Sequence, residues 1–258
     1  MPIDEIEVPG SSFSCTSYSF KTDAITPLFK RLVAEEEVFN LTEEKAGFHD
    51  LDSNGKVIRG WYSQVVPFEV EHLTDGMVTK TLLKRVESCE FFGLNGVLFA
   101  TGKLGPQKSM AQTVTALSGF GVTPFEFEFT QMSQFQDRLS MLKAIVLTNP
   151  KDREVRRARL AGRIENYSTY NVIDPRNHGI DSVSGLIDGP LGPMTLTVSA
   201  KGKLRLNVRK GFLLTIDCLL WVLAMVRDEK PPTMPQLPGS AFKAKNTERI
   251  DDLNDDGE

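Results

Sequence analysis

The longest apolar stretch of the sequence, FLLTIDCLLWVLAMV at residues 212–226, most restricts how the chain can fold. It is 15 residues long and contains Asp217, whereas a helix needs roughly 20 apolar residues to span a bilayer. Because the stretch is hydrophobic on nearly every side, we expect a helix that lies at the centre of the fold or packs against a second subunit. The sequence therefore predicts a buried helix and no association with a membrane.

Short strands separated by turn residues dominate the first 140 residues. The runs VESCEFF and VLFATG, joined by the turn GLNG, predict a hairpin over residues 86–102. A helix at about residues 107–117 follows and ends at Gly119. Further elements are expected as strands at residues 11–20, 46–51 and 57–70, a helix from Thr22 or Asp23 to Glu37, and a short helix or loop at residues 74–84.

The stretch TPFEFEFT, residues 123–130, alternates phenylalanine with glutamate. In a strand, its phenylalanines would face the core and its glutamates would face solvent. A polar connector at about residues 131–140 would then lead to a second unit. That unit is expected to contain the strand KAIVLT, a turn-rich passage at residues 174–193, and a hairpin formed by TLTVSA and KLRLNV.

These elements predict an α+β fold with two units of mostly antiparallel sheet, each packed by one or two helices. The units are residues 1–140 and 141–228, and residues 229–258 form a Pro-rich linker and a flexible, disordered acidic C-terminal tail. Both units contain a hairpin followed by a helix, but no residue-by-residue repeat supports a duplication. The opening MPIDEIEVPG lacks an apolar run and the three cysteines are far apart, so we expect a cytoplasmic protein.

The charge of the chain is distributed unevenly. Residues 1–140 hold 12 Lys and Arg against 19 Asp and Glu, a net charge of −7. Residues 141–228 hold 14 against 8, a net charge of +6, and residues 229–258 hold 4 against 7, a net charge of −3. The overall charge of −4 therefore conceals a basic second unit.

Two stretches carry most of this positive charge, KDREVRRARLAGR at residues 151–163 and KGKLRLNVRK at residues 201–210. In the second stretch cations alternate with Leu and Val, so a strand would bury the aliphatic side chains and line its open face with cations. If the two stretches adjoin, they form a basic sheet surface suited to a phosphate backbone. The candidate nucleic-acid-binding residues are Arg156, Arg157, Arg159, Arg163, Lys201, Lys203, Arg205, Arg209 and Lys210.

Basic residues on a strand can also serve solubility or protect a sheet edge from aggregation. A second alternative is docking onto an acidic surface, including the acidic unit or tail of this chain. Aromatic side chains that could stack on bases are not interleaved with the cations, so any nucleic-acid binding would rely on phosphates rather than on base readout.

The stretch HDLDSNGKVIRGW, residues 49–61, resembles a calcium-binding loop in the spacing of its acidic residues. Counted from Asp50, the twelfth position should be a bidentate glutamate but is Trp61. Asn-Gly is also the strongest two-residue hairpin signal, and its residues favour positive φ. We therefore predict a turn, with positive φ at Asn54 and Gly55.

A loop around His178 is the best candidate for an active site. It places Asp174 and Asp181 near a histidine that could act as a general base, which would fit a hydrolase or metal-dependent nuclease. The same composition is typical of ordinary turns, and no catalytic or metal-binding spacing accompanies it.

The sequence thus predicts a non-catalytic, cytoplasmic nucleic-acid-binding or accessory protein that grips the DNA or RNA backbone and needs no cofactor or metal. The alternatives are a structural or assembly protein, for example a homodimer that uses the basic strand and apolar helix to meet protein partners, and a hydrolase or nuclease with a site near His178.

Overall fold

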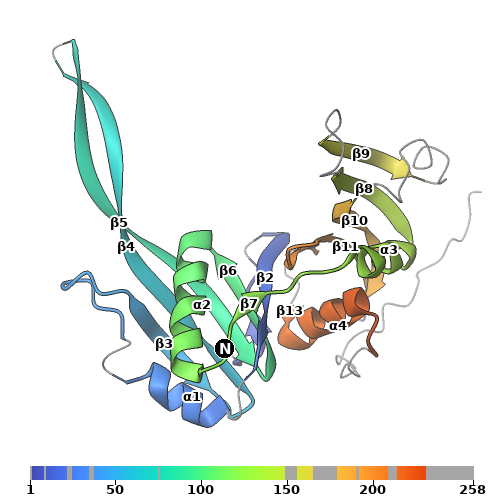
Figure 1. The fold of residues 1–258 in the computed structure, drawn as a ribbon, viewed down its shortest axis with the longest axis horizontal. Coiled ribbons are helices and arrows are strands. Elements are labelled where there is room, and N and C mark those ends of the chain that lie inside the picture. The colour runs from blue at the N-terminus through green and yellow to red at the C-terminus, as the bar shows by residue number, and fades with distance from the viewer. Residues whose placement is uncertain are drawn as a thin grey trace, which may run out of the picture.

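The computed structural model describes residues 2–8, 10–21, 25–34, 38–74, 76–148, 156–164, 179–189, 192–208 and 214–230. Most of these residues belong to one antiparallel sheet of 11 strands, accompanied by a two-stranded sheet and by helices (Figure 1). The predicted α+β class is therefore confirmed. The predicted acidic tail lies outside the described residues.

The strands of the two predicted units join edge to edge. The strand order is β3-β4-β5-β6-β2-β12-β11-β10-β8-β9, with the short β7 also paired to β2. The junction is the pairing of β2 with β12, which places Cys15 opposite Leu204. The bounds of the large sheet's strands are β2 Ser12–Phe20, β3 Gly47–Ser53, β4 Val57–Thr74, β5 Met77–Leu94, β6 Gly96–Gly102, β7 Thr123–Pro124, β8 Met141–Thr148, β9 Arg157–Ile164, β10 Gly179–Gly189, β11 Gly192–Ser199 and β12 Lys203–Asn207.

Helices cover opposite faces of this sheet in its two halves. Helices α1 (Ile25–Leu32) and α2 (Leu104–Ser118) share a core with Leu98 of β6. The next residue along β6, Phe99, joins a different core that contains α4 (Ile216–Arg227). Successive side chains of a strand point to opposite faces, so α2 and α4 lie on opposite sides. Of the helices that the structure describes, none consequently covers the sheet face opposite α4 over β8 to β12.

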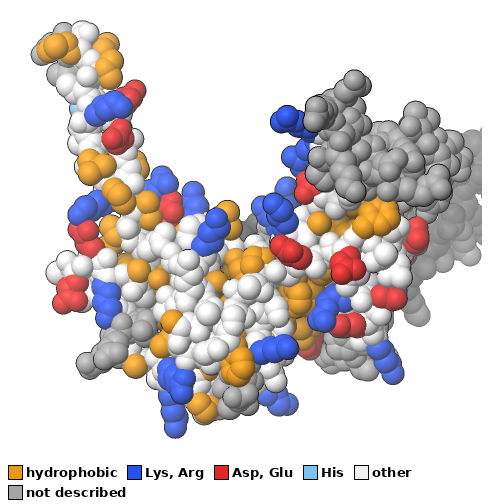
Figure 2. Space-filling view, in the orientation of Figure 1, with side chains coloured by type: hydrophobic (Ala, Val, Ile, Leu, Met, Phe, Trp, Pro, Cys, Tyr) orange, Lys and Arg blue, Asp and Glu red, His pale blue; other side chains and the backbone are white. Residues whose placement is uncertain are grey.

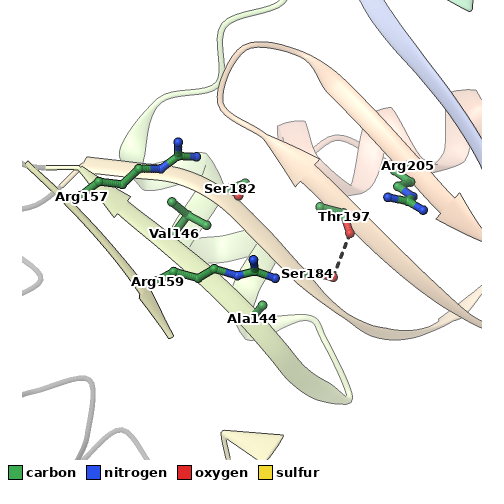
Figure 3. Close-up of a pocket in the computed structure, with 8 residues that line it drawn as sticks. All are labelled: Ala144, Val146, Arg157, Arg159, Ser182, Ser184, Thr197 and Arg205. Atoms are coloured by element: carbon green, nitrogen blue, oxygen red, sulfur yellow. Dashed lines mark hydrogen bonds between the residues drawn. The ribbon is translucent and has the colours of Figure 1, made fainter. Parts of the chain in front are cut away.

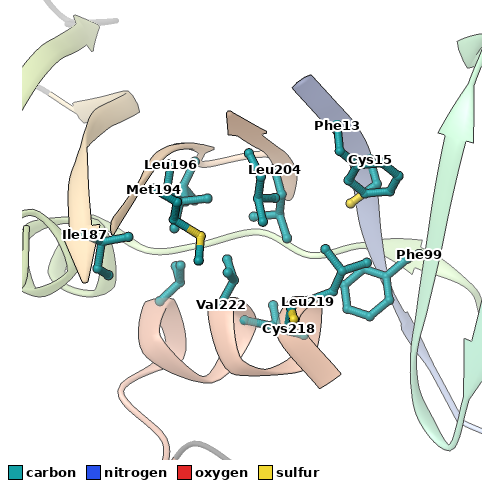
Figure 4. Packing of buried hydrophobic residues seen from close by; sticks show 14 of the residues in the cluster. Phe13, Cys15, Phe99, Ile187, Met194, Leu196, Leu204, Cys218, Leu219 and Val222 are labelled. Atoms are coloured by element: carbon teal, nitrogen blue, oxygen red, sulfur yellow. The ribbon is translucent and has the colours of Figure 1, made fainter. Parts of the chain in front are cut away.

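Helix α4 is the buried helix that the sequence predicts. Leu219 and Val222 are fully buried against Leu196 and Leu204 of the sheet (Figure 4). The helix begins at Ile216, later than the apolar run, because Leu214–Thr215 forms the short strand β13, which pairs with β1 (Glu5–Ile6). The apolar run therefore also supplies the strand β13 of the small second sheet. Among the described residues no helix is long and apolar enough to cross a bilayer.

Strands β4 and β5 form a hairpin of two 18-residue strands whose distal half projects from the body (Figure 1). The prediction of a helix or loop at residues 74–84 is wrong, because strand pairing continues to the pair Thr74 and Met77. The overlooked signal is the Asp-Gly pair at residues 75–76, since Gly76 has a φ of +80°. We call the distal part, residues 65–86, the arm.

The Asn-Gly turn between β3 and β4 is confirmed. Gly55 has a φ of +83°, as predicted. Asn54 does not have positive φ; instead its Oδ1 accepts hydrogen bonds from the backbone N–H groups of Lys56 (3.0 Å) and Val57 (2.9 Å). Asn54 is therefore explained by its side chain, which closes the turn, rather than by its backbone conformation.

The predicted strand over residues 123–130 and the polar connector after it are wrong. Only Thr123–Pro124 pair as β7, and helix α3 spans Phe129–Asp137. Glu128 caps this helix in a capping box with Gln131, a pairing that outweighs the alternation of Phe and Glu. Phe127 is buried as expected, whereas Phe129 is 40% exposed.

Of the remaining predictions for the second unit, some are confirmed and one is wrong. The strand KAIVLT and the hairpin of β11 and β12 are confirmed. The predicted turn-rich passage at residues 174–193 is wrong over β10, which pairs with both β8 and β11. The first part of that passage, including Asp174 and His178, lies outside the described residues.

The three cysteines are free and buried. Burial raises the pKa of the Cys89 thiol to about 12 from an ordinary 9.0, and it also raises the pKa values of Cys15 and Cys218. A protonated, inaccessible thiol is a poor nucleophile. All three thiols should therefore react slowly with alkylating labels while the protein is folded.

Candidate nucleic-acid interface

The face of β8 to β12 opposite α4 carries four of the basic residues that the sequence singled out. On β12, Leu204 and Leu206 are fully buried on the α4 side, so Lys203 and Arg205 point to the opposite, exposed face. This is the alternation that KLRLNV predicts. We call the open surface of β8 to β12 the arginine face.

Residues of both basic stretches lie on this face, although the two strands that carry them are not neighbours. Arg157 and Arg159 of β9 line the same hollow as Arg205 of β12, and the hollow has a volume of about 590 Å³ (Figure 3). Strands β8, β10 and β11 lie between β9 and β12, and four strand spacings correspond to about 19 Å. The arginines therefore flank a shallow surface that is several strands wide.

Small and hydroxyl-bearing side chains form the floor between the arginines. Ser184 Oγ and Thr197 Oγ1 are 2.8 Å apart and share a hydrogen bond, while Lys143 Nζ donates to Thr195 Oγ1 at 2.9 Å. Short side chains let an extended ligand approach the sheet closely. Their hydroxyl groups are also donors that proteins commonly use toward phosphate oxygens.

The cations of this face differ in how far they are already neutralised. Arg157 Nη2 lies 2.7 Å from Asp181 Oδ2, and Arg205 Nε donates to Ser12 Oγ at 3.1 Å. Within the part of the chain that the structure describes, the side chains of Arg159 and Lys203 form no ion pair or hydrogen bond. At least two positive charges are thus available to a ligand without breaking an existing contact.

The nine predicted binding residues are placed unequally. Arg157, Arg159, Lys203 and Arg205 lie on the arginine face, Arg156 is exposed just before β9, and Lys201 is exposed in the turn between β11 and β12. Arg163 belongs to β9, but its side chain lies outside the described residues, as do Arg209 and Lys210.

Sequence reasoning missed the floor residues Lys143, Ser184, Thr195 and Thr197. The alternation of Thr with apolar residues in TLTVS could have indicated that these hydroxyls share one face. Strand β9 lies at the end of the strand order, so its arginines can also disfavour pairing with another sheet edge.

A larger hollow of about 1000 Å³ adjoins the arginine face at Lys203. Strand β2 pairs with β12 over residues 12–16 but with β6 only from Thr16 onward, so the sheet opens between β2 and β6. Trp61, Glu90 and Gln107 also line this opening. It extends the accessible surface from the arginine face to the junction of the two halves.

The surroundings of these hollows are concave on a larger scale. Figure 2 shows a broad depression between the projecting hairpin and the β8–β9 end of the sheet, with Lys and Arg side chains on both walls. A long, thin, anionic ligand could pass through such a depression and remain in contact with cations.

The structure gives little support to the alternative site near His178. His178 and Asp174 lie outside the described residues, and the Asp181 carboxylate is bound to Arg157. Across the described ranges, no group of three or more His, Cys, Asp and Glu is arranged to hold a metal ion.

Comparison with known proteins yielded no match to any family model and no curated protein of similar sequence.

Proposed function

We propose that the chain is a cytoplasmic, non-catalytic protein that binds the phosphate backbone of nucleic acid on the arginine face. The observation that carries this proposal is the convergence of Arg157, Arg159 and Arg205, from strands at the two ends of the second half, around one hollow. Arginine presents several N–H donors in a planar fork that matches phosphate oxygens. Lys203 and the floor hydroxyls supplement these donors.

The composition of the hollow favours binding without base readout. Its described lining consists of arginines and small residues, and none of these residues is an aromatic side chain on which a base could stack. Phosphate contacts fix the position of a nucleic acid but carry no sequence information directly. Binding should consequently be similar for unrelated sequences of equal length.

The test is the salt dependence of binding to a fluorescently labelled 30-base-pair DNA duplex, measured by anisotropy. If about four cations replace counterions, affinity falls roughly 100-fold between 50 and 200 mM salt, and a duplex of scrambled sequence behaves alike. The matching single strand serves as a second ligand, with a shallower expected slope. An affinity that does not change with salt, or no binding at 50 mM salt, would refute the proposal.

A second candidate function, assembly through protein contacts, is favoured by the arm. Leu73, Met77, Val78 and Leu82 are 64–72% exposed there. Lys80 is paired with Glu69 (3.3 Å) and Glu71 (3.1 Å), so the distal arm offers no surplus of cations to phosphate. An isolated two-stranded hairpin is only marginally stable in water. Exposed clusters of apolar side chains commonly mark sites of protein–protein contact.

Shortening the arm tests this candidate. Residues 69–82 are replaced by Asn-Gly, which joins the paired residues Phe68 and Leu83. None of the deleted residues that the structure describes is buried or belongs to either core, so the unfolding midpoint should change by only a few degrees. Light scattering should show that the parent chain self-associates at micromolar concentration and that the shortened chain is monomeric.

The double substitution Leu73→Thr and Val78→Thr is the matched control, because it keeps the ribbon and removes a cross-strand apolar pair. It should weaken self-association without abolishing the arm. A parent chain that is monomeric at all concentrations would exclude assembly by self-association.

A further inference from the structure

We infer that the arginine face binds an acidic peptide, and that the peptide it binds is this chain's own segment at residues 248–258. The segment, ERIDDLNDDGE, contains six carboxylate side chains and one arginine. The arginine face is opposite in charge and carries Arg157, Arg205, Arg159 and Lys203, of which the last two form no ion pair or side-chain hydrogen bond with any described residue. The docking itself depends only on these charges. Its effect on the affinity for nucleic acid rests on the proposed function.

The length of the intervening chain permits this contact. The described chain ends at Lys230, directly after α4, which packs against the other side of the same strands. Seventeen residues, 231–247, separate Lys230 from the acidic segment, and extended they span up to roughly 60 Å. The face is about 19 Å wide, so the segment reaches it around a sheet edge.

The proline content of the connecting residues disfavours compact conformations that would shorten their span. Residues 231–238, PPTMPQLP, contain four prolines, which favour an extended backbone. A tether of this size holds the acidic segment near the face at a local concentration on the order of millimolar. The contact is thereby favoured over the same peptide in free solution.

The expected strength is modest. Exposed ion pairs contribute roughly 0.2–1 kcal/mol each, and they weaken as salt is added. With only a few such pairs, the docked and released states should both be populated at low salt. Phosphates of a nucleic acid would compete for the same cations, so the segment should reduce affinity for nucleic acid about threefold to tenfold at 50 mM salt and hardly at all at 300 mM.

A spin label on the segment gives a direct readout of docking. Because Cys15, Cys89 and Cys218 are buried, the substitution Asn254→Cys provides a single reactive thiol in the full-length chain. At 50 mM salt, amide signals of β9 and β12 should be broadened, whereas those of α1 and β3 should not. At 500 mM salt the broadening should disappear.

Two variants show whether charge is responsible. Asp251, Asp252, Asp255 and Asp256 are changed to Asn in the labelled chain, which keeps its length and tether. This variant should lose the broadening of β9 and β12 and should bind the DNA duplex more tightly. Labelled chain carrying Arg159→Glu and Arg205→Glu should also lose the broadening.

The outcomes separate this inference from the proposed function. Broadening that is absent at 50 mM salt, or that persists in the Asn variant, overturns the docking even if DNA binds as proposed. Charge-dependent broadening without any DNA binding supports the docking and refutes the proposed function. Broadening spread evenly over the chain also overturns the inference, because it would show that the segment has no preferred site.

Discussion

Replacing both Arg159 and Arg205 with glutamate should lower affinity for the DNA duplex by more than about 100-fold at 50 mM salt. Hydrogen bonds to charged groups contribute about 1.5–3 kcal/mol each, and about 1.4 kcal/mol corresponds to a tenfold change in affinity. The two side chains come from β9 and β12, so the double variant disables both flanks of one hollow. The corresponding alanine variant should reduce the salt slope by about two.

A charge-matched control distinguishes a defined site from net charge. Lys45 and Lys56 are exposed cations of the first half, away from the arginine face, and their double substitution with glutamate changes the net charge equally. Affinity should fall less than about threefold, because exposed charges beyond a Debye length of about 10 Å are screened. Equal losses for the two double variants would contradict a localised interface, and so would no loss for the arginine pair.

The elements that the sequence predicted correctly are those in which local signals agree. In KLRLNV the alternation fits a half-buried strand, and the preceding Lys-Gly pair fits a turn, since Gly202 has a φ of +72°. The apolar run likewise left little choice but a buried helix. The division into units ending at residues 140 and 228 remains a prediction.

The errors arose where one local signal concealed another. Alternating Phe and Glu suggested a strand, but the capping interaction of Glu128 with Gln131 begins helix α3 there. The turn-rich passage expected at residues 174–193 overlaps β10, which contains Gly185 and Gly189. Glycine at position 185 allows the backbone of β10 to lie close to the backbone at Met141. A Cβ at this position would lie only 2.5 Å from Met141 O. The part of the arm at residues 74–84 was missed because the described residues of its strands are exposed on both faces, so the pattern of alternation is weak.

The candidate site could be predicted only in part. Local patterns show which cations of β12 face outward, but they do not give the strand order. Arg159 and Arg205 share a face because β10 inserts between β8 and β11, and β9 is placed outside β8. Such non-local pairings depend on the packing of the whole sheet, which no single stretch of sequence specifies. The partial neutralisation of Arg157 by Asp181 is likewise a tertiary contact.

The second large effect is expected at Gly202, in the turn where the two halves of the sheet meet. Its carbonyl oxygen accepts hydrogen bonds from both the backbone N–H and the hydroxyl of Ser17, each at 2.8 Å. A Cβ at this position would lie 2.7 Å from Phe125 O and 2.9 Å from Ser17 O. These are backbone atoms, so they cannot move aside without breaking the Phe125 N–H bond to Ser17 O at 2.9 Å.

Gly202→Ala should therefore lower the free energy of unfolding by about 2–5 kcal/mol, combining left-handed backbone strain of about 1–2 kcal/mol with overpacking of about 1–3 kcal/mol. Gly119→Ala is the matched control, because Gly119 has a similar φ of +75° but nothing within 4 Å of the added Cβ. Urea unfolding should show a loss of only about 1–2 kcal/mol for this control. Equal losses would mean that backbone conformation alone explains Gly202, whereas a larger loss at Gly202 would show that close backbone contact there holds β2 and β12 together.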